Sequence, residues 1–118
     1  MWTKYDATGS PITNTTPAEY PTQRVISSGT TDGGPATMAA GNVLCIWNSS
    51  STGAKTQTVP TSTGSGNKLT IVDQANTAAT YNITISPVSG SVLGNNLVYT
   101  NKGYQSWIDS VNGWINAQ

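Results

Sequence analysis

The stretch GNKLTIVDQANTAATYNITISPVSG, Gly66 to Gly90, is the part of the chain that indicates the fold most clearly. Two runs rich in β-branched residues, 68–73 and 81–86, flank a polar break. Within each run, apolar residues recur at every second position: Leu69 and Ile71, then Tyr81, Ile83 and Ile85. A period of two is that of a strand with one buried face, so the stretch predicts two strands and their connection. Asp73 closes the first run and Pro87 stops the second, as turn residues do.

Similar short runs, separated by turn residues, occupy the rest of the chain from Asn42 onward. Residues 42–48, NVLCIWN, are nearly all apolar and are predicted to form a strand that is buried on both faces. Weaker strand patterns follow at 55–60 and 96–100. Many short strands between turns are typical of all-β proteins. We therefore predict an all-β fold, a small antiparallel β-sandwich or barrel, for a β-domain of residues 42–118.

The C-terminal residues 104–116 fit two structures. Their apolar residues recur at the spacing of one helical face: Trp107, Ile108, Val111, Trp114 and Ile115. The alternative is a hairpin with strands at 104–109 and 113–116, because Asn112-Gly113 is a strong turn signal. Glycine inside a helix also costs about 1 kcal/mol relative to alanine. Periodicity alone leaves both structures open.

Residues 1–41 differ in composition from the rest of the chain. Pro, Thr and Asn dominate the first part, a Gly-Gly-Pro break follows at 33–35, and residues 23–27 form the only plausible strand. Such a segment does not fold on itself as a compact unit, so it is either disordered or an extended, mostly irregular arm on a neighbouring subunit. The arm is favoured, because the segment holds apolar anchors expected to contact the particle or another subunit: Trp2, Tyr5, Ile12 and Tyr20.

The chain carries very little charge. Only 8% of its 118 residues are charged, against about 25% in an average domain, and five basic residues balance five acidic ones. Binding to nucleic acid or to an anionic membrane needs clustered Lys or Arg, so neither partner is expected. No run approaches the roughly 20 apolar residues of a membrane span. A neutral surface of hydroxyls and amides suits a subunit that stays assembled.

Residues that could perform catalysis or bind a metal are scarce. The chain has no histidine and a single cysteine, which excludes Ser-His-Asp, Cys-His and zinc arrangements. Cys45 lies between Leu44 and Ile46 and is expected to be a small buried residue. Asp73 and Asp109 are the remaining candidates for a glycosidase-like carboxylate pair, although Asp at a strand end more often caps a turn. We therefore expect no enzyme, no cofactor and no metal.

Aromatic side chains could form a platform for a sugar or a receptor. Five are available: Trp47, Tyr99, Tyr104, Trp107 and Trp114. Because the chain has no Phe, the favoured interpretation is that these residues are the large members of the core. If a receptor or glycan platform exists, we expect it at Tyr104, Trp107 and Trp114.

Residues 67–116 resemble a short module that recurs in virion proteins of tailed bacteriophages, in head fibres, tail fibres and tailspikes. The pattern is a strand, an Asp with a small polar turn, an ITI strand, a Gly-bounded loop and a polar strand ending in Asn. A Gly then opens another strand, and an Asp-containing turn leads to a final Trp. The matching residues are Ile71, Asp73, Ala78, Thr80, Ile83, Thr84, Ile85, Gly94, Asn101, Gly103, Trp107, Asp109, Gly113 and Trp114. Where the module usually has an aromatic residue before the glycine of its N-x-G turn, this chain has Lys102.

The resemblance implies a non-enzymatic β-module that trimerises and is displayed on a phage particle, and it favours strand–turn–strand at the C-terminus. The hypothesis is a structural bacteriophage virion protein, a capsid decoration or short head-fibre subunit. It would bind the particle through its arm and form a homotrimer through its β-domain. Its partners would be other virion proteins, chiefly the major capsid protein, within a virion assembled in the bacterial host cytoplasm. The alternative is a receptor- or carbohydrate-binding tip module of a tail fibre.

Overall fold

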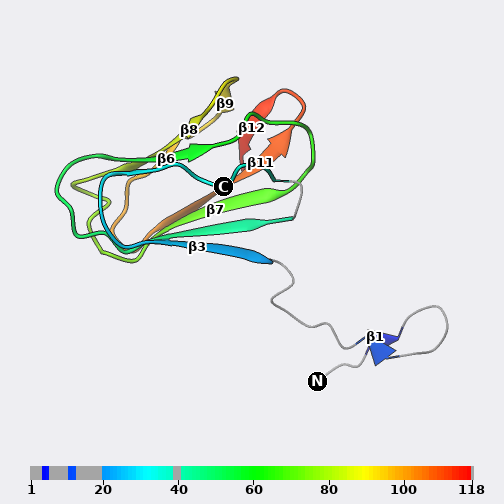
Figure 1. Cartoon of the computed structure of the whole chain (residues 1–118), viewed down its shortest axis with the longest axis horizontal. Coiled ribbons are helices and arrows are strands. Elements are labelled where there is room, and N and C mark those ends of the chain that lie inside the picture. Colours follow the sequence, from blue (N-terminus) through cyan, green and yellow to red (C-terminus); the bar gives the residue numbers. More distant parts are fainter. Residues whose placement is uncertain (1–3, 6–10, 13–19, 39–40, 118) are drawn as a thin grey trace.

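The computed structural model of the chain describes residues 4–5, 11–12, 20–38 and 41–117 (Figure 1). Every helix or strand assigned within these residues is a β-strand, which confirms the all-β prediction. The strands are β1 (Lys4–Tyr5), β2 (Pro11–Ile12), β3 (Thr22–Ile26), β4 (Thr31–Asp32), β5 (Val43–Trp47), β6 (Lys55–Val59), β7 (Lys68–Asp73), β8 (Ile83–Pro87), β9 (Val92–Leu93), β10 (Leu97–Val98), β11 (Tyr104–Ser110) and β12 (Gly113–Asn116).

The strands form two large sheets and a separate pair, β1–β2. The six-stranded sheet has the order β3-β5-β7-β11-β12-β9, and the four-stranded sheet has the order β10-β8-β6-β4. From β3 to β8 the chain alternates between the two sheets, and each strand pairs in parallel with the strand two positions later. The chain therefore winds as a β-solenoid in which each coil gives one strand to each sheet (Figure 1).

The predicted antiparallel sandwich or barrel is wrong in its pairing, because the strands of the solenoid run parallel. Alternation with a period of two reports which face of a strand is buried, but not which strand lies beside it. Thr22 pairs with Val43, and Val43 pairs with Leu69, so successive coils are 21 and then 26 residues long. Coils of unequal length leave no fixed period in the sequence, and a fixed period is the usual signature of a solenoid.

Antiparallel strands close the C-terminal end of the solenoid. β11 pairs antiparallel with β7 and with β12, and β10 pairs antiparallel with β8. β11 and β12 form the predicted hairpin of residues 104–116, so the helical alternative is wrong. Gly113 opens β12 with a φ of 130°, and a Cβ added there would lie 2.6 Å from the backbone oxygen of Ser91. This conformation is open to glycine and closed to other residues, which favours the turn over the helix.

Part of the predicted N-terminal arm belongs to the solenoid. β3 pairs with β5, and β4 pairs with β6. The domain boundary predicted between residues 41 and 42 therefore separates strands that belong to the same sheet. The composition of residues 1–41 did not predict these strands, because a parallel pair is held by main-chain hydrogen bonds. Polar residues such as Thr22 and Gln23 form these bonds just as apolar residues do. Residues 4–5 and 11–12 of the predicted arm form the separate β1–β2 pair. Four further parts of it lie outside the described residues: 1–3, 6–10, 13–19 and 39–40.

The core lies between the two large sheets. Its largest fully buried side chains are Trp47, Trp107 and Trp114. The aliphatic residues of the opening stretch face this core as the alternation predicted: Leu69, Ile71, Ile83 and Ile85. The prediction that residues 42–48 are buried on both faces is wrong for the outer face of β5, where Leu44 and Ile46 are half-buried.

Candidate functional site

The carboxylate of Asp109 is enclosed by the loop that follows β6. Asp109 Oδ1 accepts hydrogen bonds from the backbone N–H groups of Thr63 and Gly64, at 2.7 and 3.1 Å. Asp109 Oδ2 accepts hydrogen bonds from the hydroxyls of Thr63 and Ser65, at 3.1 and 2.5 Å. Burial raises the pKa of Asp109, but these hydrogen bonds outweigh burial and hold the pKa below its ordinary value. Asp109 therefore ties this loop to the closing hairpin.

Asp73 caps a turn at the other end of the β7–β11 pair. Its Oδ2 accepts hydrogen bonds from the backbone N–H groups of Thr77 and Ala78, both at 2.9 Å. The backbone N–H of Lys102 donates to the same oxygen at 3.1 Å. Lys102 adopts a left-handed φ of 58° at this turn. Asp73 therefore caps the turn that follows its strand, which confirms the interpretation favoured from the sequence. Asp109 instead lies within β11 and holds the distant loop after β6, so the turn-capping interpretation is wrong for Asp109.

The two carboxylates do not form a catalytic pair. The backbone N–H of Asp73 donates to Gly103, whereas the backbone N–H of Asp109 donates to Asn67. Asp73 and Asp109 therefore lie at opposite ends of the β7–β11 pair. At about 3.3 Å per residue, the six residues of β7 between these ends span about 20 Å. The two usual glycosidase geometries place the carboxyls about 5 to 9.5 Å apart, and neither fits.

A chain of polar contacts crosses the core between the first two coils. Trp47 Nε1 donates to Gln57 Oε1 at 2.9 Å, and Gln57 Nε2 donates to Asp32 Oδ2 at 2.6 Å. Arg24 holds the same carboxylate with Nε and Nη2, at 3.1 and 2.8 Å. Burial raises the pKa of Asp32, but the hydrogen bonds from Arg24 and Gln57 and the charge of Arg24 lower it below its ordinary value. The four residues come from four different strands, so no sequence spacing predicts this network.

A buried lysine, Lys55, faces inward from β6 and is 1% exposed. Its Nζ lies 5.2 Å from the centroid of the Tyr81 ring and 3.4 Å from Thr77 Oγ1. The face of an aromatic ring attracts a cation and helps to offset the loss of water around it. The turn that Asp73 caps therefore also supplies a hydroxyl that holds Lys55.

Cys45 is fully buried on the inner face of β5, which confirms the interpretation from its apolar neighbours. Burial raises the pKa of the Cys45 thiol to about 12. At neutral pH the side chain is therefore a protonated thiol, and the nucleophilic thiolate is not formed. The residue packs in the core as a small apolar group.

Two of the three residues of the predicted aromatic platform are buried. Trp107 and Trp114 are fully enclosed, so the platform prediction is wrong for both. Their indole N–H groups donate to the backbone oxygens of Asn95 and Pro60, at 2.7 and 2.9 Å. With no Phe in the chain, tryptophans supply the bulk of the core. Tyr104, the third residue, is exposed at the start of β11.

Of the four predicted arm anchors, Tyr20 is the one whose side chain is among those that the structure describes. It is half-buried, and its hydroxyl lies 2.7 Å from Thr70 Oγ1 in β7. Tyr20 therefore packs on the chain's own six-stranded sheet, a contact that its position in the predicted arm did not indicate. Tyr5 belongs to β1 and Ile12 belongs to β2, whereas Trp2 lies outside the described residues.

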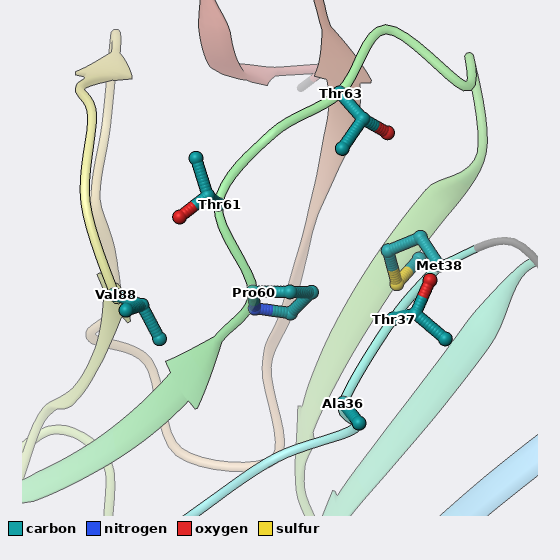
Figure 2. Close-up of a pocket in the computed structure, with 7 residues that line it drawn as sticks. All are labelled: Ala36, Thr37, Met38, Pro60, Thr61, Thr63 and Val88. Atoms are coloured by element: carbon teal, nitrogen blue, oxygen red, sulfur yellow. The ribbon is translucent and has the colours of Figure 1, made fainter.

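Figure 2 shows a pocket of about 330 Å³ between the loops that connect the two sheets. Three parts of the chain line it: Ala36, Thr37 and Met38; Pro60, Thr61 and Thr63; and Val88. Its volume lies within the range of about 300–1,000 Å³ that is typical of small-molecule sites. Apolar side chains and threonine hydroxyls make up the lining, and the Thr63 hydroxyl is already bonded to Asp109. The lining residues include no ionisable side chain, so they offer no acid or base for a reaction.

The sequence matches no protein-family model and no curated protein. In the part of the chain that the structure describes, no three His, Cys, Asp or Glu side chains gather into a group that could hold a metal ion. The described residues also include no helix that is long and apolar enough to cross a membrane.

Proposed function

We propose that this chain is a structural subunit of a bacteriophage virion, a capsid decoration or short head fibre, that acts by binding other virion proteins. One observation carries the proposal: the residues behind the resemblance are those that shape the C-terminal half of the solenoid. Asp73 and Asp109 fix its loops, and Trp107 and Trp114 fill its core. If this chain and the phage module share an architecture, their sequences should match at the positions that determine the course of the backbone.

The polar groups of the fold support a role without chemistry. The carboxylates of Asp32, Asp73 and Asp109 are all occupied by hydrogen bonds that hold strands and loops together. Cys45 is buried and protonated at neutral pH. Such a protein acts by binding its partners through buried surface. A standard stable interface buries about 1,600 Å² in total.

The N-terminal residues before Tyr20 are the proposed contact with the particle. They contain Trp2, Tyr5 and Ile12, apolar residues that a spacer would not need. Tyr20 marks the point at which the chain joins the solenoid, because its hydroxyl binds Thr70. A segment of this length can cover much of a standard interface, at the entropic cost of ordering it.

The receptor- or carbohydrate-binding tip is less well supported. It needs aromatic rings exposed on one face, and Trp107 and Trp114 are enclosed in the core. Tyr99 and Tyr104 are exposed, just after β10 and at the start of β11, and without the two tryptophans these two tyrosines make a smaller platform for a sugar.

The test of the virion role is mass spectrometry of purified phage particles from the host that encodes this chain. We expect the chain among the particle proteins in a fixed ratio to the major capsid protein. A chain found only in the soluble fraction of the lysate would overturn the proposal.

The test of the arm is a deletion of residues 2–19, which keeps Tyr20 and all of β3. We expect the shortened chain to lose binding to particles that lack the native protein, with a circular-dichroism spectrum and urea midpoint close to those of the full chain. Normal binding by the shortened chain would rule out the arm as the particle contact.

A further inference from the structure

The turn between β11 and β12 contains the chain's one Asn-Gly pair, Asn112-Gly113. Val111 and Asn112 form the tip of this turn, and both are exposed. The backbone N–H of Asn112 donates to Ser110 Oγ at 3.2 Å, and Gly113 has a positive φ of 130°. Glycine suits this position because it has no Cβ. For the same reason, its backbone nitrogen is open to the side-chain carbonyl carbon of the asparagine before it.

The side-chain amide of Asn112 has no hydrogen bond to any other residue that the structure describes. It is therefore free to rotate toward the backbone nitrogen that follows it. Asn116, at the end of β12, provides a contrast within the same hairpin, because it also precedes a small residue, Ala117. Its Nδ2 donates to Gln105 Oε1 and to the backbone oxygen of Ser106, both at 3.1 Å. These two bonds fix the Asn116 side chain.

The other asparagines lack this combination of a free amide and a following glycine. Each is followed by a residue that carries a side chain, and a Cβ hinders the approach to the backbone nitrogen. Five of them are held, in addition, by a hydrogen bond of the side chain: Asn42, Asn67, Asn82, Asn95 and Asn101. Asn112 is therefore the position at which the neighbouring residue and the surroundings both favour a reaction of the amide.

We propose that Asn112 is a site at which the chain modifies itself: the Gly113 nitrogen attacks Cγ of Asn112, and ammonia leaves. The N–Cγ bond forms, the Cγ–Nδ2 bond breaks, and the proton of the Gly113 N–H completes the ammonia. Water then opens the cyclic imide at either of its two carbonyl carbons, which yields aspartate or isoaspartate. Asparagine is among the thermolabile residues of proteins, and this reaction needs no reactant besides water. The chemistry is the same whether or not the chain belongs to a virion.

Either product adds a carboxylate to the turn. An exposed carboxyl of this kind has a pKa of about 3.9, so it is ionised at neutral pH. The unmodified chain carries five basic and five acidic residues, and the modified chain therefore has one net negative charge. A protein without net charge gains solubility from such a change.

Isoaspartate also changes the backbone, because the chain then runs through Cγ and gains one carbon–carbon bond, about 1.5 Å long. In the hairpin, Ser110 pairs with Gly113, and Asp109 pairs with Trp114. The length of the turn sets this register. A longer turn therefore disturbs the pairs that place Trp114 in the core and Asp109 against its loop. We expect the isoaspartate form to unfold at a lower urea concentration.

The test follows the purified full chain at mildly alkaline pH without denaturant. Isoelectric focusing measures the acidic form, and peptide sequencing by mass spectrometry assigns the converted residue. We expect the acidic form to accumulate with time and to carry aspartate or isoaspartate at position 112, while Asn116 stays an amide. Asn112→Ser, which keeps the glycine, is the matched control and should remove most of the acidic form over the same period.

A second measurement separates the added charge from the added backbone bond. Asn112→Asp should keep a urea midpoint close to that of the wild type, whereas the isoaspartate form, isolated by ion exchange, should unfold at a lower urea concentration. Equal midpoints for the two forms would refute the expected disturbance of the hairpin. A folded chain that retains Asn112, or converts Asn116 equally fast, would overturn the inference. Conversion that occurs only in urea would do so as well, because it would show that the folded turn protects the amide.

Discussion

Asp109 Oδ1 lies 2.7 Å from the backbone nitrogen of Thr63, 46 residues earlier in the chain. The contact joins the loop after β6 to β11, and thus a coil of the solenoid to the hairpin that closes it. The backbone N–H of Gly64 and the hydroxyl of Ser65 converge on the same carboxylate. A loop rich in Ser, Thr and Gly is therefore fixed by a single acidic side chain.

Replacing Asp109 with Asn should destabilise the protein by about 1–3 kcal/mol, because an amide NH₂ would face donors that now bind a carboxylate oxygen. The measurement is the free energy of unfolding in urea. Asn112→Ser, at an exposed position in the neighbouring turn, is the control and should change stability by less than about 0.5 kcal/mol. Equal midpoints for the wild type and Asp109→Asn would show that the enclosed carboxylate contributes nothing.

Stability should fall as the pH drops below about 4. Asp32 and Asp109 have folded-state pKa values below the ordinary value. The unfolded chain therefore takes up protons first, so these groups stabilise the fold above their unfolded pKa of about 3.9 and lose that effect as pH falls through their folded pKa. Because the chain has no histidine, urea midpoints should be nearly constant from about pH 5 to pH 8.

The double variant Asp32→Asn/Asp109→Asn provides the control for this pH dependence. It should be less stable at pH 7 and should lose less of its remaining stability between pH 5 and pH 2.5. A wild-type midpoint that already falls between pH 7 and pH 5 would contradict the assignment to these two aspartates.

The three tryptophans of the core should be shielded from water. In a Trp2→Phe background, iodide should quench the fluorescence of Trp47, Trp107 and Trp114 weakly in the folded protein and strongly in urea, because all three are fully buried. Trp107→Ala should cost about 3–5 kcal/mol of stability. Strong quenching of the folded protein would instead place one of these rings at the surface, as the platform prediction requires.

Gly113→Ala should be more harmful than Gly33→Ala. The φ of Gly113 is 130°, and the new methyl group would meet the backbone oxygen of Ser91, so we expect a loss of about 1–3 kcal/mol. A Cβ on Gly33 meets no atom within 4 Å, so that variant should be nearly neutral. The measurement is thermal unfolding, and equal melting temperatures would mean that the turn can shift to accept a side chain.

The local elements could be predicted from the sequence, and the topology could not. The alternation in 68–73 and 81–86 predicted two strands with Leu69, Ile71, Ile83 and Ile85 on the buried face, because side-chain period is a property of the strand itself. The bounds of the second strand were wrong, since β8 begins at Ile83, leaves Tyr81 outside and includes Pro87. Pairing depends on which strand lies alongside, and coils of unequal length removed the period that would have revealed a solenoid. The strand β4 has two residues, Thr31 and Asp32, which is too short to show any alternation.

Among the candidate site residues, too, the sequence predicted roles that depend on local position and missed those that depend on packing or distant contacts. Asp73 was recognised as a turn-capping residue because its position at a strand end is visible in the sequence. The contact of Asp109 with a loop 46 residues earlier has no local signal, so the sequence did not predict it. Trp107 and Trp114 were named both as core and as platform residues, and only packing between the sheets separates the two roles. The contact of Tyr20 with Thr70 joins residues 50 apart, and no local pattern reports it.

Cys45 should react with a thiol reagent only when the protein opens. Its side chain is fully buried and burial raises its pKa to about 12, so at pH 8 the folded protein offers neither access nor thiolate. The free energy of opening obtained from labelling should equal the global free energy of unfolding in urea. Thr31→Cys, at an exposed position on β4, is the control and should be labelled at once. Cys45 pairs with Arg24 of β3, which is an edge strand of the six-stranded sheet. Labelling of Cys45 that is faster than global unfolding would therefore mean that β3 separates from the sheet by itself.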